Sequence, residues 1–315
     1  VACAAEGGST TTTGEVVTTT TSADPTTTAA PLSTTTAADA GFPVTVEAAN
    51  GEVTVPDSPT RIVSLAPTAT EMLFAIGAGE QVVAVDDFSN YPEEAPITDL
   101  SGFEPNIEAI AAYEPDLVVV SDDINDVVAA LTAIDIPVVH NPAAATLDDT
   151  YAQIELLAQA TGHPDESSAL VASMREDIDQ LITAVPETAE AHDYYHELDG
   201  SFFTVTSATF IGQLYDLAGL DNIADDAEGA DTGYPQLSAE YIIEADPDLI
   251  FLADTKCCGE SLESVAARPG WDVLTAVTRG GVVELDDDIA SRWGPRVVDH
   301  LAIIVEEVQG LAESR

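Results

Sequence analysis

The chain has 315 residues, 45% of them apolar, which is enough for two domains that each bury a core. Its 57 acidic residues outnumber its 8 basic residues and give a net charge of -49, which excludes nucleic acid as a partner and disfavours direct binding to an anionic membrane surface. The acids are scattered rather than grouped, so they indicate a solvated surface, such as that of a protein from a saline habitat, and not a cation-binding function.

Residues 1–41 are dominated by Thr, Ala, Ser, Gly and Pro, and this composition predicts a disordered segment because it buries too little apolar surface. Val1-Ala2-Cys3 resembles the end of a bacterial lipobox, which implies a lipidated Cys3 at the head of a tether; the alternative is an incidental cysteine. No apolar run approaches the ~18–20 residues of a membrane span. No export signal is present in the sequence, so we expect that such a segment has been removed.

Strands and helices alternate in the first part of the folded region. A hairpin is predicted over residues 44–55, around the turn formed by Asn50-Gly51. Further along, the apolar pattern predicts strands at 61–65, 82–85, 117–120 and 137–140, and helices at 67–76, 107–113 and 127–134. Runs that are apolar on both faces are typical of a mostly parallel sheet covered by helices.

A longer helix is predicted over residues 165–185, where apolar residues recur at helical spacing up to Pro186. The alternation then restarts, with strands predicted at 194–198, 202–205, 249–252 and 282–285, and helices at 210–217, 240–244 and 297–311. The predicted organisation is therefore a tether (1–41), an N-terminal α/β lobe (42–163), a connecting helix (164–186) and a C-terminal α/β lobe (187–315).

One phrase occurs once in each predicted lobe. Residues 106–118 and 238–250 both contain a Glu, apolar residues at helical spacing, and then Pro-Asp-Leu with a β-branched run. Glu108 is as far from Pro115 as Glu240 is from Pro247. The repeat predicts two like lobes, each with a matching acidic residue.

Several motifs occur in the order expected for one family: Arg61 to Glu71, Asp87-Phe88-Ser89-Asn90-Tyr91-Pro92, Phe210-Ile211-Gly212, Leu217-Ala218-Gly219 and Asn222-Ile223-Ala224. With these motifs the chain resembles the class III solute-binding proteins of bacterial ABC importers for cobalamin, ferric siderophores and haem. The resemblance covers about residues 60 to 310. It implies two Rossmann-like lobes joined by one long rigid helix, with the ligand in a cleft between the lobes.

The resemblance also implies a role for the repeated glutamates. In this family one exposed Glu on each lobe pairs with arginines of the membrane subunits, and the matching positions here are Glu108 and Glu240. An Arg–carboxylate pair on each lobe would fix orientation as well as attraction. The alternative is that both are helix N-terminal acids that the helix dipole favours. Glu71 is predicted to be a local helix-start acid.

Aromatic residues in loops are the candidates for contact with the ligand, because α/β sheets place ligands beyond the carboxyl ends of their strands. Phe88, Tyr91 and Phe103 follow predicted first-lobe strands, Tyr234 precedes the second repeat, and Trp293 lies in the segment 291–296. For each of them the alternative is a core position.

Basic residues gather in one stretch: Lys256, Arg268, Arg279, Arg292 and Arg296. In so acidic a chain this favours an anionic ligand, and Arg292 with Trp293 would suit a planar, negatively charged chelate through charge and stacking. Arg296 is assigned to the same site. The alternative is that these residues pair with acids of the chain itself.

Cys257 and Cys258 are adjacent and follow a predicted strand. In an extracytoplasmic protein with a lipidated Cys3 we favour a disulfide between them, with free thiols or a soft-metal site as the alternatives. His192, His196 and Glu197 do not predict a metal site, because strand residues four apart are ~13 Å apart. No catalytic constellation or resident cofactor is predicted.

The predicted function is that of a monomeric, lipid-anchored extracytoplasmic binding protein that delivers a ferric siderophore, or a related iron chelate or corrinoid, to an ABC permease and its ATPase. The alternatives are a cobalamin or haem carrier of the same fold, a carrier for a bare metal ion such as zinc or manganese, or a two-lobed α/β enzyme. The basic cluster is the reason for placing the siderophore first.

Overall fold

The computed structural model describes residues 41–186 and 192–313, so the predicted tether and Cys3 lie outside the described residues. The described chain begins with the predicted hairpin, in which β1 (Val44–Ala48) pairs antiparallel with β2 (Gly51–Val55). Gly51 has a positive φ of 93°, which a residue without a Cβ adopts at little cost. The Asn-Gly turn signal is thus confirmed.

The first lobe is built on a parallel sheet of four strands in the order β4-β3-β5-β6. The strands are β3 (Ile62–Leu65), β4 (Val82–Val85), β5 (Leu117–Val120) and β6 (Val138–His140). The helices between them are α1 (Pro67–Ala75), α2 (Ile107–Ala111) and α3 (Val127–Thr132). All of these elements were predicted, although α2 and α3 each end two residues earlier.

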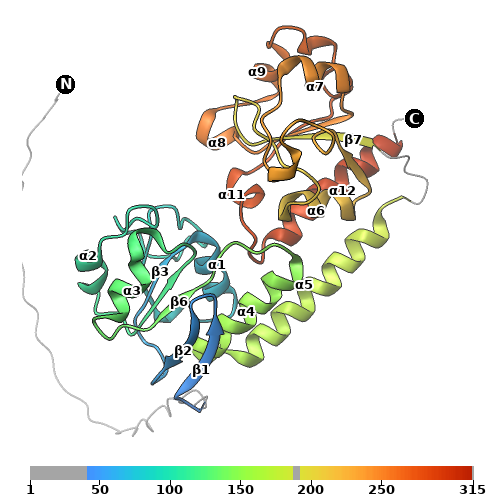
Figure 1. Cartoon of the computed structure of the whole chain (residues 1–315). Helices are drawn as coiled ribbons and strands as arrows, with labels where there is room; N and C mark the ends of the chain where they lie inside the picture. The colour runs from blue at the N-terminus through green and yellow to red at the C-terminus, as the bar shows by residue number, and fades with distance from the viewer. Residues whose placement is uncertain (1–40, 187–191, 314–315) are drawn as a thin grey trace, which may run out of the picture. The chain divides into compact units, whose positions relative to one another are not determined.

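Two consecutive helices follow the first sheet (Figure 1): α4 (Leu147–Thr161) and α5 (Pro164–Ala184). The sequence analysis missed α4, whose start is marked by a capping box between Thr146 and Asp149. Gly162 ends α4 in the left-handed conformation, and Pro164 occupies the first turn of α5, where its missing N–H has no cost. The long predicted helix is confirmed as α5.

The second sheet is also parallel, with its strands in the order β8-β7-β9-β10. The strands are β7 (His192–Glu197), β8 (Leu220–Asn222), β9 (Leu249–Leu252) and β10 (Val282–Glu284). The helices are α6 (Phe210–Leu217), α7 (Ala239–Ala245), α8 (Thr255–Cys258), α9 (Leu262–Ala266), α10 (Thr275–Arg279), α11 (Asp287–Ala290) and α12 (Val297–Glu313).

One predicted strand is wrong. Residues 202–205 form no strand; Phe202 has a φ of 68°, outside the extended region, and Phe203 makes a single bridge with Gln236. The strand that pairs with β7 at the edge of the sheet is β8, which was not predicted from the sequence. Its three residues, Leu-Asp-Asn, are too few and too polar to show a strand pattern.

The two sheets have the same topology. In the first sheet, β3 lies between β4 and β5, the strand that ends the repeated phrase. In the second sheet, β7 lies in the same way between β8 and β9. The duplicated phrase therefore marks equivalent positions in two like α/β units, and the α/β fold class is confirmed. The described residues belong to one contact unit, so the lobe boundaries at 163/164 and 186/187 stay predictions.

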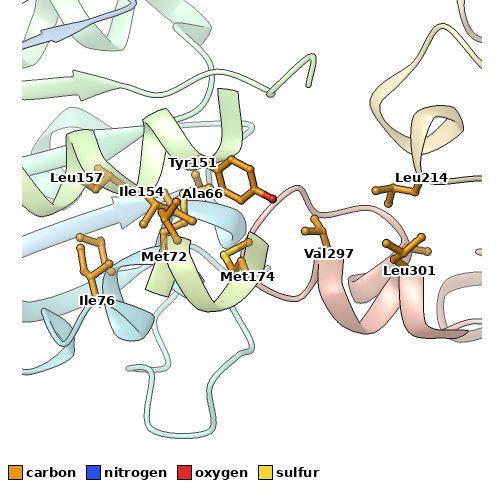
Figure 2. Packing of buried hydrophobic residues seen from close by; sticks show 14 of the residues in the cluster. Ala66, Met72, Ile76, Tyr151, Ile154, Leu157, Met174, Leu214, Val297 and Leu301 are labelled. Atoms are coloured by element: carbon orange, nitrogen blue, oxygen red, sulfur yellow. The ribbon is translucent and has the colours of Figure 1, made fainter. Parts of the chain in front are cut away.

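The largest hydrophobic cluster draws residues from both halves of the chain (Figure 2). Met72 of α1 and Ile76, which caps the end of that helix, pack with Ile154 and Leu157 of α4, and Met174 contributes from α5. The same cluster continues through residues of α6 and α12, including Leu214, Val297 and Leu301. Smaller clusters fill the opposite faces of the two sheets, beneath α2 and α3 in the first and α7 and α9 in the second.

Candidate functional site

The repeated glutamates occupy matching places in two short helices. Glu108 in α2 and Glu240 in α7 are both exposed and both lie in the first helical turn. Asn106 and Ser238 cap the two helices by accepting hydrogen bonds from the N–H of Ala109 and Tyr241, respectively, each three residues on. The two carboxylates are thus presented to solvent by equivalent local structure.

The Pro-Asp part of each repeat joins its helix to the sheet in the same way. The residue before each Pro, Glu114 or Asp246, has a left-handed φ of 48° or 47°. The next acid then donates its N–H to the strand start of its own lobe, from Asp116 to Arg61 O and from Asp248 to Asp193 O. The two copies of the repeat therefore share a backbone conformation and a hydrogen bond as well as a sequence pattern.

Exposed aromatic rings gather in the loops that follow β4. Phe88 and Phe103 are 54% and 64% exposed, and their rings meet edge to face with centroids 5.5 Å apart. Tyr91 in the same loop is 45% exposed. These predicted ligand residues are brought together at the carboxyl edge of the first sheet, where large apolar side chains without a core role are available to a ligand.

Asp86 supports this loop from below. Its carboxylate accepts a hydrogen bond from Ser89, whose hydroxyl also meets Thr70 Oγ1 of α1 at 2.9 Å. Burial raises the pKa of Asp86, while the hydrogen bond from Ser89 acts in the opposite direction. The loop start is thereby tied to α1, and the aromatic residues beyond it remain outside the core.

Tyr234 and Trp293 have different surroundings. Tyr234 is 52% exposed in the second lobe, just ahead of the second repeat, as a ligand residue should be. Trp293 is half-buried against the large core cluster, and its Nε1 donates to Gln153 Oε1 of α4 at 3.0 Å. The indole N–H is therefore directed at α4, and the role of Trp293 beside Arg292 as a ligand residue stays a prediction.

Arg292 and Arg296 share one buried carboxylate. Glu71 accepts Arg296 Nε and Nη2 at 2.9 and 2.6 Å, and Arg292 Nη1 at 2.7 Å. The Glu71 side chain is 1% exposed. The prediction that Glu71 is a local helix-start acid is therefore wrong. Its carboxylate joins α1 to the segment between α11 and α12.

Arg292 also holds the aromatic loop. Its Nη2 donates to Phe88 O and Asn90 Oδ1, each at 2.9 Å, and to Asp288 Oδ1 at 2.7 Å. Arg296 stacks over the ring of Tyr91, with its guanidinium carbon 4.2 Å from the ring centroid. Both arginines therefore contact the candidate site through internal partners rather than through a free guanidinium.

The same holds for two other bases of the predicted cluster. Lys256 pairs with Asp286 and Asp288 at 2.5 and 3.0 Å, and Arg268 grips Glu197 with two hydrogen bonds of 2.6 Å. The alternative of internal pairing is therefore what the structure shows for four of the five bases of the cluster. These four bases are paired with acidic side chains of the chain itself.

A cavity of about 380 Å³ adjoins these residues; it is lined by Glu71, Phe74, Tyr91 and Arg296, among others. A larger cavity of about 500 Å³ lies along α4, α5 and α6, but none of the predicted ligand residues lines it. We take the aromatic edge beside the smaller cavity as the candidate ligand site, because exposed rings and polar groups converge there.

Cys257 and Cys258 are free and exposed, so the predicted disulfide is not formed in the structure. They are consecutive residues of α8, where side chains one position apart point about 100° away from each other. A hydrogen bond with Cys258, together with burial, raises the pKa of the Cys257 thiol to about 12. The pair stands at the carboxyl end of β9 as adjacent thiols.

The histidines of β7 have structural partners. His192 Nδ1 lies 2.8 Å from Asp248 Oδ2, and His196 Nδ1 lies 2.7 Å from the hydroxyl of Tyr215. Burial lowers the pKa of His196 to about 3 and that of the nearby His300 of α12 to about 4. Within 41–186 and 192–313, no group of three or more His, Cys, Asp and Glu side chains could hold a metal ion.

A buried carboxyl closes β9. Asp254 is fully buried, and both of its carboxylate oxygens lack a hydrogen-bond partner. Burial raises its pKa to about 7, and the neighbouring Glu197 and Glu260 add to the effect. The sequence analysis gave no signal for this group, because an Asp after a strand is usually a solvated turn residue.

The two parallel sheets, with α4 and α5 between them along the chain, are typical of one class of protein: the two-lobed α/β solute-binding proteins. The family model described as "Periplasmic binding protein" matches residues 62–289, and the chain belongs to this family. Its members are carriers rather than enzymes. The chain is thus an extracytoplasmic solute-binding protein of an ABC importer for vitamin B12, haem or an iron siderophore, which works with a permease and an ATPase.

The similar sequences agree with this assignment. A cobalamin-binding protein of Halobacterium salinarum is 32% identical over 271 residues, covering 83% of this chain and 73% of the relative. An ABC transporter substrate-binding lipoprotein of Bacillus subtilis is 30% identical over 283 residues, covering 87% of this chain and 85% of the relative.

Solved structures extend the likeness to the fold. The periplasmic vitamin B12-binding protein of Vibrio cholerae has a TM-score of 0.67 at 26% identity, and the match covers 82% of this chain and 99% of that one. A periplasmic haem-binding protein of Roseiflexus has a TM-score of 0.69 at 25% identity, with 79% and 98% covered. No described helix is long and apolar enough to cross a membrane.

Proposed function

We propose that this protein captures a corrinoid of the cobalamin type and delivers it to the importer. The observation that carries the proposal is the set of exposed rings at the candidate site, Phe88, Phe103 and Tyr91, beside arginines that already have carboxylate partners. Such a surface suits a large ligand with an apolar face and little negative charge. A corrinoid fits that description.

The internal ion pairs weaken the case for an anionic siderophore. That expectation rested on the bases between residues 256 and 296, and four of them are engaged by acids of the chain. A ligand carboxylate or catecholate would have to displace a well-placed charge-assisted hydrogen bond. The relatives named for cobalamin or vitamin B12 support the corrinoid in addition.

The test is calorimetric titration of the protein with cyanocobalamin, haem and a panel of ferric siderophores. We expect saturable one-to-one binding of the corrinoid and none of the others. Phe88→Ala and Tyr234→Ala should each weaken corrinoid binding on the order of tenfold, about 1.4 kcal/mol. Val273→Ala is the matched control, since Val273 is 69% exposed but outside the candidate site. Preferential binding of haem or a siderophore would overturn the proposal.

We propose further that Glu108 and Glu240 dock the carrier on the permease. Their support is the equivalent, solvent-facing placement of two carboxylates on two like helices. An arginine of each membrane subunit could then form a bidentate pair with one lobe, which fixes orientation.

We also propose that Cys3 carries the lipid that keeps the protein at the cell membrane. The proposal rests on the lipobox-like sequence and the Thr-rich stretch after it. Metabolic labelling with a fatty acid should mark the wild-type protein and not Cys3→Ala. An unlabelled wild-type protein in the membrane fraction would contradict the lipid anchor.

A further inference from the structure

The two thiols in α8 stand on a well-fixed support. The single carboxylate of Asp287 accepts the N–H of Lys256 at 3.0 Å, the N–H of Cys257 at 2.8 Å and the hydroxyl of Thr255 at 2.9 Å. These bonds fasten the turn that carries the thiols to α11. Both Cys257 and Cys258 remain exposed on it.

The same turn is linked to the aromatic loop of the first lobe. Lys256 Nζ lies 3.0 Å from Asp288 Oδ2, and that oxygen accepts Asn90 Nδ2 at 2.9 Å. Asn90 follows Phe88 by two residues and precedes Tyr91. One carboxylate therefore joins the residue beside the thiols to the loop that carries two candidate ligand residues.

Two adjacent thiols do not complete a metal site by themselves. The described residues offer no third His, Cys, Asp or Glu that could close one around an ion. A metal that binds here must therefore bring its remaining ligands with it. A corrinoid does so, because its macrocycle fills the equatorial positions of cobalt and leaves an axial position open to exchange.

We propose that the Cys257–Cys258 pair supplies an axial sulfur ligand to the cobalt of a bound corrinoid. The inference rests on the proposed corrinoid function and deepens it. In the aqua form the cobalt–water bond breaks and a cobalt–sulfur bond forms. The water leaves, the thiol releases its proton to solvent, and cobalt stays Co(III), so no oxidant or reductant is needed. Thiolate is the form of cysteine that binds metals, so coordination to cobalt must displace the proton that the raised pKa of Cys257 retains.

This coordination gives the carrier a preference among corrinoids. Aquacobalamin has an exchangeable axial water, whereas cyanocobalamin holds cyanide strongly in the same position. The thiol pair therefore adds affinity only for the first of these ligands. The remaining contacts, including the aromatic rings, are common to both.

The test uses the full chain carrying Cys3→Ser, so that only the α8 thiols can react. Free thiols are counted after reduction and desalting, and the absorbance spectrum is recorded with aquacobalamin. We expect a shift to the spectrum of a cobalt–thiolate complex, which Cys257→Ser/Cys258→Ser abolishes. That variant should lose aquacobalamin affinity on the order of tenfold and keep its cyanocobalamin affinity.

The outcomes are separable. Tight binding of aquacobalamin without a spectral shift, or a shift that survives in the double serine variant, would overturn the axial ligand and leave the proposed function standing. A disulfide between Cys257 and Cys258 that resists reduction would have the same meaning. Failure of both cobalamins to bind would overturn the proposed function and this inference together.

Discussion

Four glutamates divide into a buried pair and an exposed pair. Glu71 and Glu197 have side chains 1% and 0% exposed, and each is gripped by arginine. Glu108 and Glu240 lie on the surface in short helices. A buried carboxylate must have internal partners because leaving water is costly, whereas an exposed one is free to meet a partner molecule. The burial of each glutamate thus separates the structural role of the first pair from the docking role proposed for the second.

The two buried glutamates differ in what they connect. Glu71 binds Arg292 and Arg296, which are 221 and 225 positions away in the sequence. These bonds connect α1 to the segment before α12. Glu197 pairs with Arg268, 71 positions away within the second lobe, and Arg268 keeps Glu260 as another partner at 2.8 Å. The first pair therefore joins distant parts of the chain, and the second stabilises one lobe.

The largest expected effect comes from Glu71→Gln. The substitution leaves two buried guanidinium groups without their shared carboxylate, and breaking such a pair costs roughly 3–5 kcal/mol of unfolding free energy. Urea denaturation followed by circular dichroism measures the loss. Glu108→Gln is the exposed control and should be nearly neutral. Equal stability of the two variants would show that burial does not distinguish these glutamates.

Glu197→Gln should cost less, roughly 2–3 kcal/mol, because it leaves one guanidinium that retains Glu260. It also removes a negative charge that raises the pKa of Asp254. The same variant should therefore lower the Asp254 pKa, which carboxyl NMR titration can follow. An unchanged Asp254 pKa would mean that Glu197 does not act on this carboxyl.

The buried histidines make stability fall in acid. His196 and His300 have folded-state pKa values of about 3 and about 4, below the ordinary value of 6.5, so their contribution is present above pH 6.5 and is lost as pH falls toward those values. Between pH 7 and pH 5 each should cost roughly 2 kcal/mol. His300→Gln should flatten this part of the stability curve.

Asp254 acts in the opposite direction and serves as the control. Its folded-state pKa of about 7 lies above the ordinary 3.8, so its ionisation opposes folding increasingly as pH rises between these values. Asp254→Asn should therefore make the loss of stability in acid steeper, while His300→Gln makes it shallower. Parallel curves for the two variants would contradict the assignment of both groups.

The sequence predicted the repeated parts of the fold well and the long-range polar contacts poorly. Local signals sufficed for the hairpin, the strands before and after each repeat, and α5, because periodicity, turns and caps lie within a few residues of each other. The short polar strand β8 gave no such signal. The capping box at Thr146 is the local signal that marks the start of α4.

The candidate site divides in the same way. Phe88, Tyr91 and Phe103, which were predicted in loops after strands, are exposed, and so is Tyr234 ahead of the second repeat. The partners of Arg292 and Arg296 could not be predicted, since Glu71 is more than two hundred residues away and nothing local marks the pair. A Glu embedded among apolar residues of a helix was the available clue, because such a residue is rarely buried unpaired.

The smallest effect on stability is expected for the exposed pair, and it tests docking directly. Glu108→Ala and Glu240→Ala should each change the unfolding free energy by about 0.5 kcal/mol or less and leave corrinoid affinity intact. Uptake through the reconstituted importer should fall for each single variant and most for the double variant, because each carboxylate is proposed to meet one membrane subunit. Glu263→Ala is the matched control, since Glu263 is exposed in the first turn of α9 and loses the same helix-dipole contribution. If all three substitutions reduced uptake alike, or none did, Glu108 and Glu240 would be ordinary helix-start acids. Loss of uptake that is confined to Glu108 and Glu240 requires a partner that contacts both lobes.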